Sequence, residues 1–160
     1  MGGRLEMSPN PNEAPRMVVS ALADPGVEGR PGIPLDRIQI VKGWTEGGEA
    51  REEVFDIAGP GETSWSVDPA TCTTVGGGPR SLCAVWTDPE FDPSQRAFYY
   101  ARVLERPTCR WHAWFCNEAG VRCDRPETIE PDLAACCDSS YPRTLRERAV
   151  TSPIWYSPPT

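Results

Sequence analysis

The sequence predicts an all-β protein, with sandwich-like antiparallel sheets and a long C-terminal loop ordered by disulfides. Three observations lead to this prediction. The 18 prolines and 14 glycines make up 32 of the 160 residues, which argues against a helical bundle and for short strands joined by turns. Several short runs alternate in polarity or concentrate β-branched and aromatic residues. All seven cysteines lie in the second half of the chain.

The strand-like runs follow one another with turn signals between them. The first 15 residues are rich in proline and asparagine, and we expect an extended segment there, followed by a single β-rich accessory domain over 16–160. The expected strands are 16–22, 37–44, 51–58, 81–87, 96–105 and 152–156. Pro153 favours an edge position for the last of these.

Two of these runs predict a hairpin. Residues 37–44 and 51–58 flank the pair Gly47-Gly48, which supplies the positive φ angles of a tight connection. This is the clearest hairpin signal in the sequence.

The run 96–105 predicts a central strand. Aromatic and β-branched residues cluster there, and both of its faces are largely apolar. We therefore expect Phe98 and Tyr100 to be buried, with Arg102 near one edge of the buried surface. Replacing either aromatic residue is expected to disrupt the core.

The cysteines indicate a compartment. Their spacing lacks the closely spaced pairs of structural zinc sites, so disulfides formed in an oxidising compartment are the preferred interpretation, and buried cysteines of a reduced cytosolic protein are the alternative. We expect Cys72 to pair with Cys83 across the glycine turn, and adjacent Cys136 and Cys137 to bond to different partners. An odd number leaves one thiol unpaired. The disulfide candidates are Cys72, Cys83, Cys109, Cys116, Cys123, Cys136 and Cys137.

Charge and hydropathy argue against some classes of binding partner and bear on the cellular location of the protein. The net charge of −7 argues against nucleic acid and anionic membranes as partners. No apolar run approaches the roughly 20 residues of a membrane span. Residues 1–16 have neither the basic nor the apolar region of an export signal. We therefore expect such a signal upstream of this chain, and a periplasmic or secreted protein.

Candidate catalytic groups are few. The single histidine, His112, lies between two cysteines, but no orienting partner is evident, and an exposed or packed strand histidine is the simpler interpretation. The nucleophile motif G-x-S-x-G and the phosphate-binding motif G-x-x-x-x-G-K-S/T are both missing from the sequence. Carboxylate groups such as Glu52 with Glu53, and Asp88 with Glu90 and Asp92, could bind a cation, but solvated loop charge is the preferred interpretation. We expect no catalytic residue, no metal and no cofactor.

Five stretches of the chain resemble a known family: "RIQIVKGW", "AVWTDPEFDPSQRAFYYARVLERPTCRW", "CNEAGVRC", "CCD" and "ERAVTSPIWYSP". They are similar to the C-terminal portion of bacterial proteins in the "domain of unknown function 3604" family, and the similarity covers nearly the whole chain. Full-length members resemble metal-dependent hydrolases of the polymerase-and-histidinol-phosphatase type and are often exported. Their metal-binding motifs lie N-terminal to the stretches matched here.

The resemblance implies a non-catalytic C-terminal accessory domain that packs against an upstream hydrolase domain of the same longer protein. The alternative is a stand-alone secreted binding module with an aromatic and arginine-rich ligand surface. Arginine beside aromatic residues suits the capture of a carboxylate or phosphate, or an interface anchor, and an internal Arg–Glu pair is the structural alternative. The interface or ligand candidates are Arg102, Glu105, Arg110, Trp111, Arg148, Trp155 and Tyr156.

Overall fold

A computed structural model describes residues 2–5, 10, 13–60 and 65–158. Strands dominate it, and the sheets are largely antiparallel, which confirms the all-β prediction. The chain divides into two compact units. The first unit comprises Met1–Gly61, Gly78–Glu105 and Arg148–Thr160, and the second comprises Glu62–Gly77 and Arg106–Glu147.

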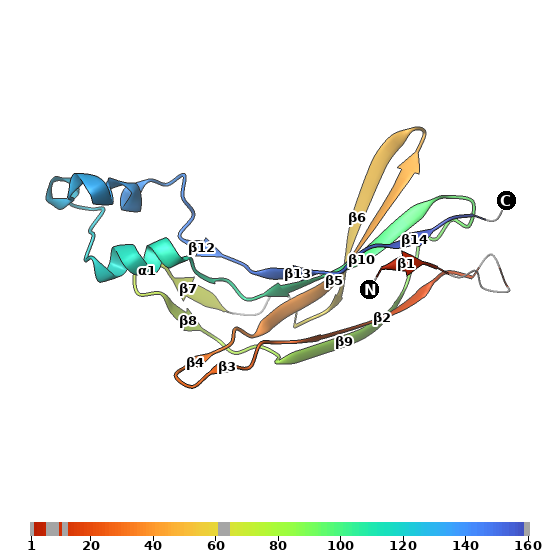
Figure 1. Cartoon of the computed structure of the whole chain (residues 1–160), viewed down its shortest axis with the longest axis horizontal. Helices are drawn as coiled ribbons and strands as arrows, with labels where there is room; N and C mark the ends of the chain where they lie inside the picture. Colours follow the sequence, from red (N-terminus) through yellow and green to blue (C-terminus); the bar gives the residue numbers. More distant parts are fainter. Residues whose placement is uncertain (1, 6–9, 11–12, 61–64, 159–160) are drawn as a thin grey trace. The chain divides into compact units, whose positions relative to one another are not determined.

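The first unit contains a six-stranded sheet (Figure 1). Its strands run in the order β1 (Gly3–Arg4), β14 (Ile154–Tyr156), β10 (Ala97–Glu105), β5 (Leu35–Glu46) and β6 (Glu49–Ala58), and β13 (Arg148–Val150) also pairs with β10. The prediction of a central strand at 96–105 is therefore confirmed.

Strand β14 lies inside this sheet rather than at its edge, so the edge prediction for 152–156 is wrong. It pairs antiparallel with β10 on one side and parallel with β1 on the other. Pro153 precedes the strand, so the ladder does not need the N–H that proline lacks. Its carbonyl instead accepts a hydrogen bond from the Gly3 amide at 3.3 Å.

Strands β5 and β6 form the predicted hairpin. Glu46 pairs with Glu49, and the two residues between them, Gly47 and Gly48, have φ angles of 60° and 87°. Two consecutive positive φ angles define the turn that matches the twist of a two-residue hairpin.

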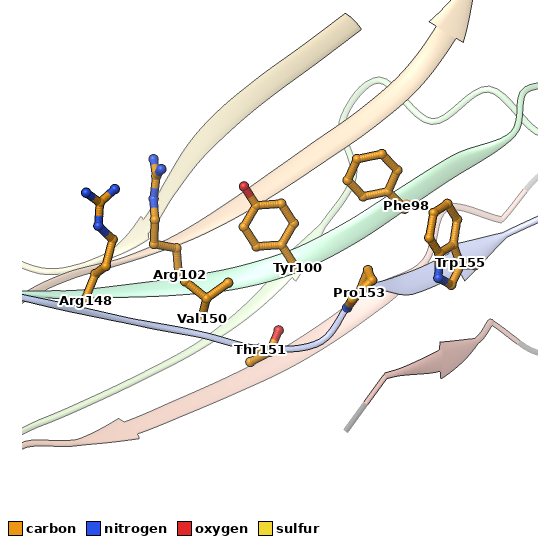
Figure 2. A pocket seen from close by; sticks show the side chains of 8 residues that line it. All are labelled: Phe98, Tyr100, Arg102, Arg148, Val150, Thr151, Pro153 and Trp155. Carbon is orange, nitrogen blue, oxygen red and sulfur yellow. The ribbon is translucent and has the colours of Figure 1, made fainter. Parts of the chain in front are cut away.

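The two faces of β10 have different environments. Figure 2 shows Phe98, Tyr100 and Arg102 on one face, which we call the outer face. On the inner face, Tyr99 is 0% exposed. The prediction that Phe98 and Tyr100 are the buried core residues is therefore wrong, since both are only half-buried.

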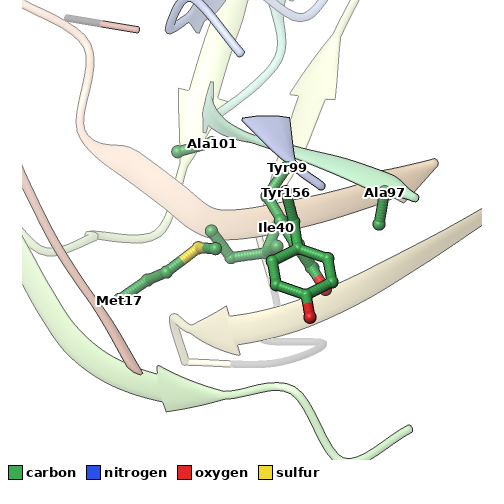
Figure 3. Packing of buried hydrophobic residues seen from close by; sticks show 6 residues of the cluster. All are labelled: Met17, Ile40, Ala97, Tyr99, Ala101 and Tyr156. Atoms are coloured by element: carbon green, nitrogen blue, oxygen red, sulfur yellow. The ribbon is translucent and has the colours of Figure 1, made fainter. Parts of the chain in front are cut away.

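A second, two-stranded sheet covers the inner face of the six-stranded sheet. Strands β2 (Arg16–Leu22) and β9 (Ser81–Thr87) pair antiparallel and pack on the inner face, so the first unit is sandwich-like. Partly buried Val19 and Trp86 from this pair pack against the core cluster. The buried members of that cluster are Met17, Ile40, Ala97, Tyr99, Ala101 and Tyr156 (Figure 3). A smaller hairpin, β3 (Gly26–Val27) with β4 (Arg30–Pro31), completes the strands of this unit.

The second unit is built on short elements and three disulfides. Its hairpin pairs β7 (Ser66–Asp68) with β8 (Thr73–Val75), and β11 (Thr108–Cys109) pairs with β12 (Thr144–Leu145). The helix α1 (Trp111–Glu118) and the 3-10 turns Pro126–Thr128 and Pro131–Cys137 lie in the long C-terminal segment. The disulfides are Cys72–Cys109, Cys116–Cys136 and Cys123–Cys137.

The cysteine predictions are confirmed in part. Adjacent Cys136 and Cys137 do bond to different partners, but Cys72 pairs with Cys109, so the predicted Cys72–Cys83 bond is wrong. Cys83 is an exposed free thiol on β9, opposite Ser20. Strand alternation aims it away from the core, whereas Cys72 belongs to the second unit.

His112 lies in a helix, so the strand prediction for it is wrong. The preceding residue, Arg110, makes no side-chain cap hydrogen bond, and the first turn contains no acidic residue. The usual signals of a helix start are therefore missing from the sequence. No helix among the described residues is long and apolar enough to cross a membrane.

Candidate functional site

The outer face of the main sheet carries a groove of about 380 Å³. Side chains from β10, β13 and β14, and from the residues between β13 and β14, line it (Figure 2). We call it the outer groove. Its lining residues are Phe98, Tyr100, Arg102, Arg148, Val150, Thr151, Pro153 and Trp155.

Strand register brings these side chains together. Phe98 lies opposite Trp155, and Arg102 lies opposite Val150. Because β13 pairs with one half of β10 and β14 with the other, the chain must bridge the interval between them. Thr151 does this, since its amide donates to the Ala101 carbonyl and its hydroxyl accepts from the Ala101 amide, both at 3.0 Å.

One end of the outer groove is aromatic. The rings of Phe98 and Tyr100 are nearly parallel, at 9°, with centroids 6.4 Å apart, and the Trp155 ring lies 5.2 Å from Phe98. Phe98 lies against the backbone of Gly43, where a Cβ atom would overlap its ring. Trp155 remains 51% exposed, so the aromatic end presents an accessible apolar surface.

The other end carries two guanidinium groups. Arg102 Nε donates to Gln39 Oε1 at 2.7 Å, and Gln39 in turn donates to Asp56 Oδ1 at 2.6 Å. The second Asp56 oxygen forms an ion pair with Arg37 at 2.8 Å. In the described part of the chain, neither Arg102 nor Arg148 has a carboxylate partner. The groove therefore combines an apolar surface with two positive charges that no described carboxylate neutralises.

The structure separates the seven sequence candidates. Arg102, Arg148 and Trp155 line the outer groove. Tyr156 lies on the opposite face, where it is 7% exposed and its hydroxyl donates to the Pro93 carbonyl at 2.8 Å. Burial, and then the charge of Asp92, raise the pKa of Tyr156. Glu105 is half-buried at the end of β10 and does not line the groove.

Arg110 and Trp111 belong to the second unit, where they line another cavity of about 580 Å³ together with Phe115 and Tyr141. His112 lies in this cavity between two rings, 6.0 Å from Trp111 and 6.4 Å from Tyr141. The cysteines that flank it, Cys109 and Cys116, are both in disulfides, so neither offers the thiolate of a Cys–His nucleophile.

A buried polar cluster was not expected from the sequence. The interpretation of Asp88 as solvated loop charge is wrong, since this residue is 3% exposed. Its Oδ2 atom lies 2.7 Å from Lys42 Nζ and accepts a hydrogen bond from the Tyr99 hydroxyl at 2.7 Å. Burial, followed by the Asp88 hydrogen bond and charge, raises the pKa of Tyr99 far above its ordinary value. One feature of the sequence could have indicated this cluster. Lys42 follows Ile38 and Ile40 at alternate positions of β5, so its side chain lies on the same buried face as theirs.

Groups of three or more potential metal ligands (His, Cys, Asp or Glu) do not occur among the described residues. The outer groove offers aromatic rings and guanidinium groups, which are side chains suited to recognition.

The model of one protein family, described as "Protein of unknown function (DUF3604)", matches residues 1–158. The chain belongs to this family. The match includes both units of this DUF3604 protein and every residue of the outer groove. Searches of curated proteins and of solved structures found no match.

Proposed function

We propose that this DUF3604 chain is a non-catalytic accessory module, and that its outer groove binds a metal-dependent hydrolase domain of the same longer protein. The observation that carries the proposal is the groove itself. It joins exposed aromatic surface to two arginines without a described carboxylate partner.

The composition of the groove suits a protein partner. Aromatic residues and arginine are enriched among the residues that dominate binding energy at interfaces. Trp155 offers a large apolar surface that a partner would bury, and Val150, which lies opposite Arg102, is 56% exposed. Arg102 and Arg148 would be complementary to carboxylates around an apolar patch of the hydrolase domain.

The three disulfides support a proposed location for this complex outside the cytoplasm. Three disulfides, in a chain whose described helices include no candidate membrane span, fit an extracellular or periplasmic protein. We propose that the longer protein is exported and that both domains mature in the same oxidising compartment.

Binding in trans tests the proposal. The chain is mixed with the separately produced hydrolase domain of the longer protein, and the Kd is measured by calorimetry. We expect Trp155→Ala and Arg102→Ala to weaken binding by about tenfold or more, because buried Trp and Arg anchors carry most of an interface's free energy.

Trp114→Ala is the matched control, since Trp114 is similarly exposed, at 55%, but lies on α1 and does not line the outer groove. Equal effects of the three substitutions, or no binding at all, would contradict the proposal.

A second candidate function rests on the parallel rings. Phe98 and Tyr100 could stack on a flat ring while Arg102 and Arg148 hold an anionic group, which would make the groove a binding site for a small acidic ligand. Titration of the isolated chain with uronic acids and aromatic carboxylates, followed by tryptophan fluorescence, distinguishes the two functions. Saturable binding that Arg148→Ala abolishes would favour the small ligand.

A further inference from the structure

The buried cluster of Lys42, Asp88 and Tyr99 takes no part in the outer groove. Lys42 is the only lysine in the chain. Its side chain is 4% exposed, that of Asp88 is 0% exposed, and Nζ lies 2.7 Å from Oδ2. We propose that Lys42 and Asp88 condense into an intramolecular amide bond between Nζ and Cγ. This isopeptide bond would join strand β5 covalently to the segment that follows β9.

The surrounding polar atoms are placed as this condensation requires. Asp88 Oδ1 accepts a hydrogen bond from the Glu90 amide at 2.9 Å, and this donor stabilises the negative charge that develops on Oδ1 when the amine adds to Cγ. Asp88 Oδ2 accepts from the Tyr99 hydroxyl at 2.7 Å, so Tyr99 can protonate the oxygen that leaves. The Glu90 carbonyl accepts from Nζ at 2.7 Å and orients the amine.

The condensation needs no external reagent. A proton first passes from the Lys42 ammonium to the Asp88 carboxylate, which gives a free amine and a carboxylic acid. The Nζ lone pair then forms the bond to Cγ, and the Cγ–Oδ2 bond breaks. Oδ2 leaves as water with the acid proton and one amine proton, and Tyr99 ends as a phenol after relaying a proton.

Burial favours the amide over the ion pair. Two charges taken out of water carry a desolvation penalty, which the neutral amide removes. Groups held in contact can react with effective molarities of about 10⁵–10⁸ M, which opposes the hydrolysis that bulk water favours. The Trp44 ring lies 5.4 Å from Nζ, and the Trp86 ring lies 6.1 Å from that of Tyr99, so aromatic side chains flank the reacting groups.

Intact mass of the denatured, non-reduced wild-type protein tests the proposal. The expected mass is that of the chain, less the hydrogens lost to its three disulfides and less one water molecule. A cyclic imide at Asp88 cannot produce the same loss, because Pro89 follows it and has no N–H. A mass without the loss of water would overturn the proposal.

Tryptic mapping locates the bond. After reduction and alkylation, the peptide from Ile38 to Arg51 should appear joined to the peptide from Ser81 to Arg96, with no cleavage after Lys42. Cleavage after Lys42 together with a free peptide from Ser81 to Arg96, or a different linkage, would overturn the assignment.

Three variants separate the roles of the groups. Lys42→Arg keeps the charge and should show no loss of water, whereas Asp88→Asn should lose ammonia instead. Tyr99→Phe should slow bond formation by about 100-fold or more after refolding, since it removes the proton relay. A water loss that persists in Lys42→Arg would overturn the proposal, and the wild-type mass decides it if a variant does not fold.

Discussion

Tyr99 and Tyr100 are neighbours in sequence but lie on opposite faces of β10. Tyr99 is 0% exposed and packs under the β2–β9 pair, whereas Tyr100 contributes to the outer groove. Their chemistry is identical, so the difference between them comes only from what covers each face. These two residues offer a direct test of the core assignment.

We expect Tyr99→Ala to lower the free energy of unfolding by about 3–5 kcal/mol, because it leaves a cavity in the core and removes a hydrogen bond to Asp88. Tyr100→Ala should cost about 1 kcal/mol, since its side chain is only half-buried. Urea denaturation of both variants measures the difference. Similar losses would show that the two faces of β10 are equally buried.

At the scale of elements, the β5–β6 hairpin depends on its turn. Gly47 and Gly48 have φ angles of 60° and 87°, a region that L-amino acid residues enter at a cost. The flanking glutamates contribute little, since Glu46 lies 3.6 Å from Arg51 in an exposed pair.

Gly48→Ala should lower the free energy of unfolding by about 1–2 kcal/mol through backbone strain. Glu46→Ala is the control and should stay within about 0.5 kcal/mol of the wild type. Thermal melts with both variants check the expectation, and a strong effect of Glu46→Ala would indicate that side-chain contacts, rather than φ, stabilise the turn.

At the scale of the whole molecule, the two units differ in what stabilises them. The first has a sandwich-like core of apolar side chains. The buried cluster of the second consists of Cys72, Cys109 and Ala113, so two of its three members form a disulfide. Disulfides commonly stabilise small domains that lack a sufficient core.

Reduction should therefore affect the units unequally. With dithiothreitol, we expect faster hydrogen exchange over Arg106–Glu147, whereas β5 and β10 stay protected, because each lost disulfide removes about 2–4 kcal/mol. Exchange measured by mass spectrometry reports both regions at once. Cys83→Ala is the control and should change neither. Loss of protection in both units together would contradict this expectation.

Activity is also a property of the whole chain. A hydrolase of the resembled type needs several histidine and carboxylate ligands to hold its metals and activate water, and this chain has a single histidine. We expect the isolated chain to hydrolyse no phosphoester with manganese or zinc. Metal-dependent turnover that survives His112→Ala in a pure preparation would show that the chain is a complete catalyst.

Local patterns by themselves were sufficient for several features. The glycine pair predicts the hairpin, the apolar run 96–105 predicts a central strand, and adjacent Cys136 and Cys137 predict bonds to two partners. Each of these depends on residues close together in sequence, where backbone geometry and alternation act directly. The helix at Trp111–Glu118 is the exception, because the usual cap signals are missing.

Tertiary structure decided the rest. Alternation along β10 specifies two faces, but only the packing of β2 and β9 determines that Tyr99, rather than Tyr100, is buried. Cysteine spacing predicts oxidation but not the Cys72–Cys109 pair, because the partners are brought together by the fold across 37 residues. In the same way, the contact between Lys42 and Asp88, and the groove that joins Arg102 to Trp155, exist only once distant strands pair, since no local pattern records which segments become neighbours.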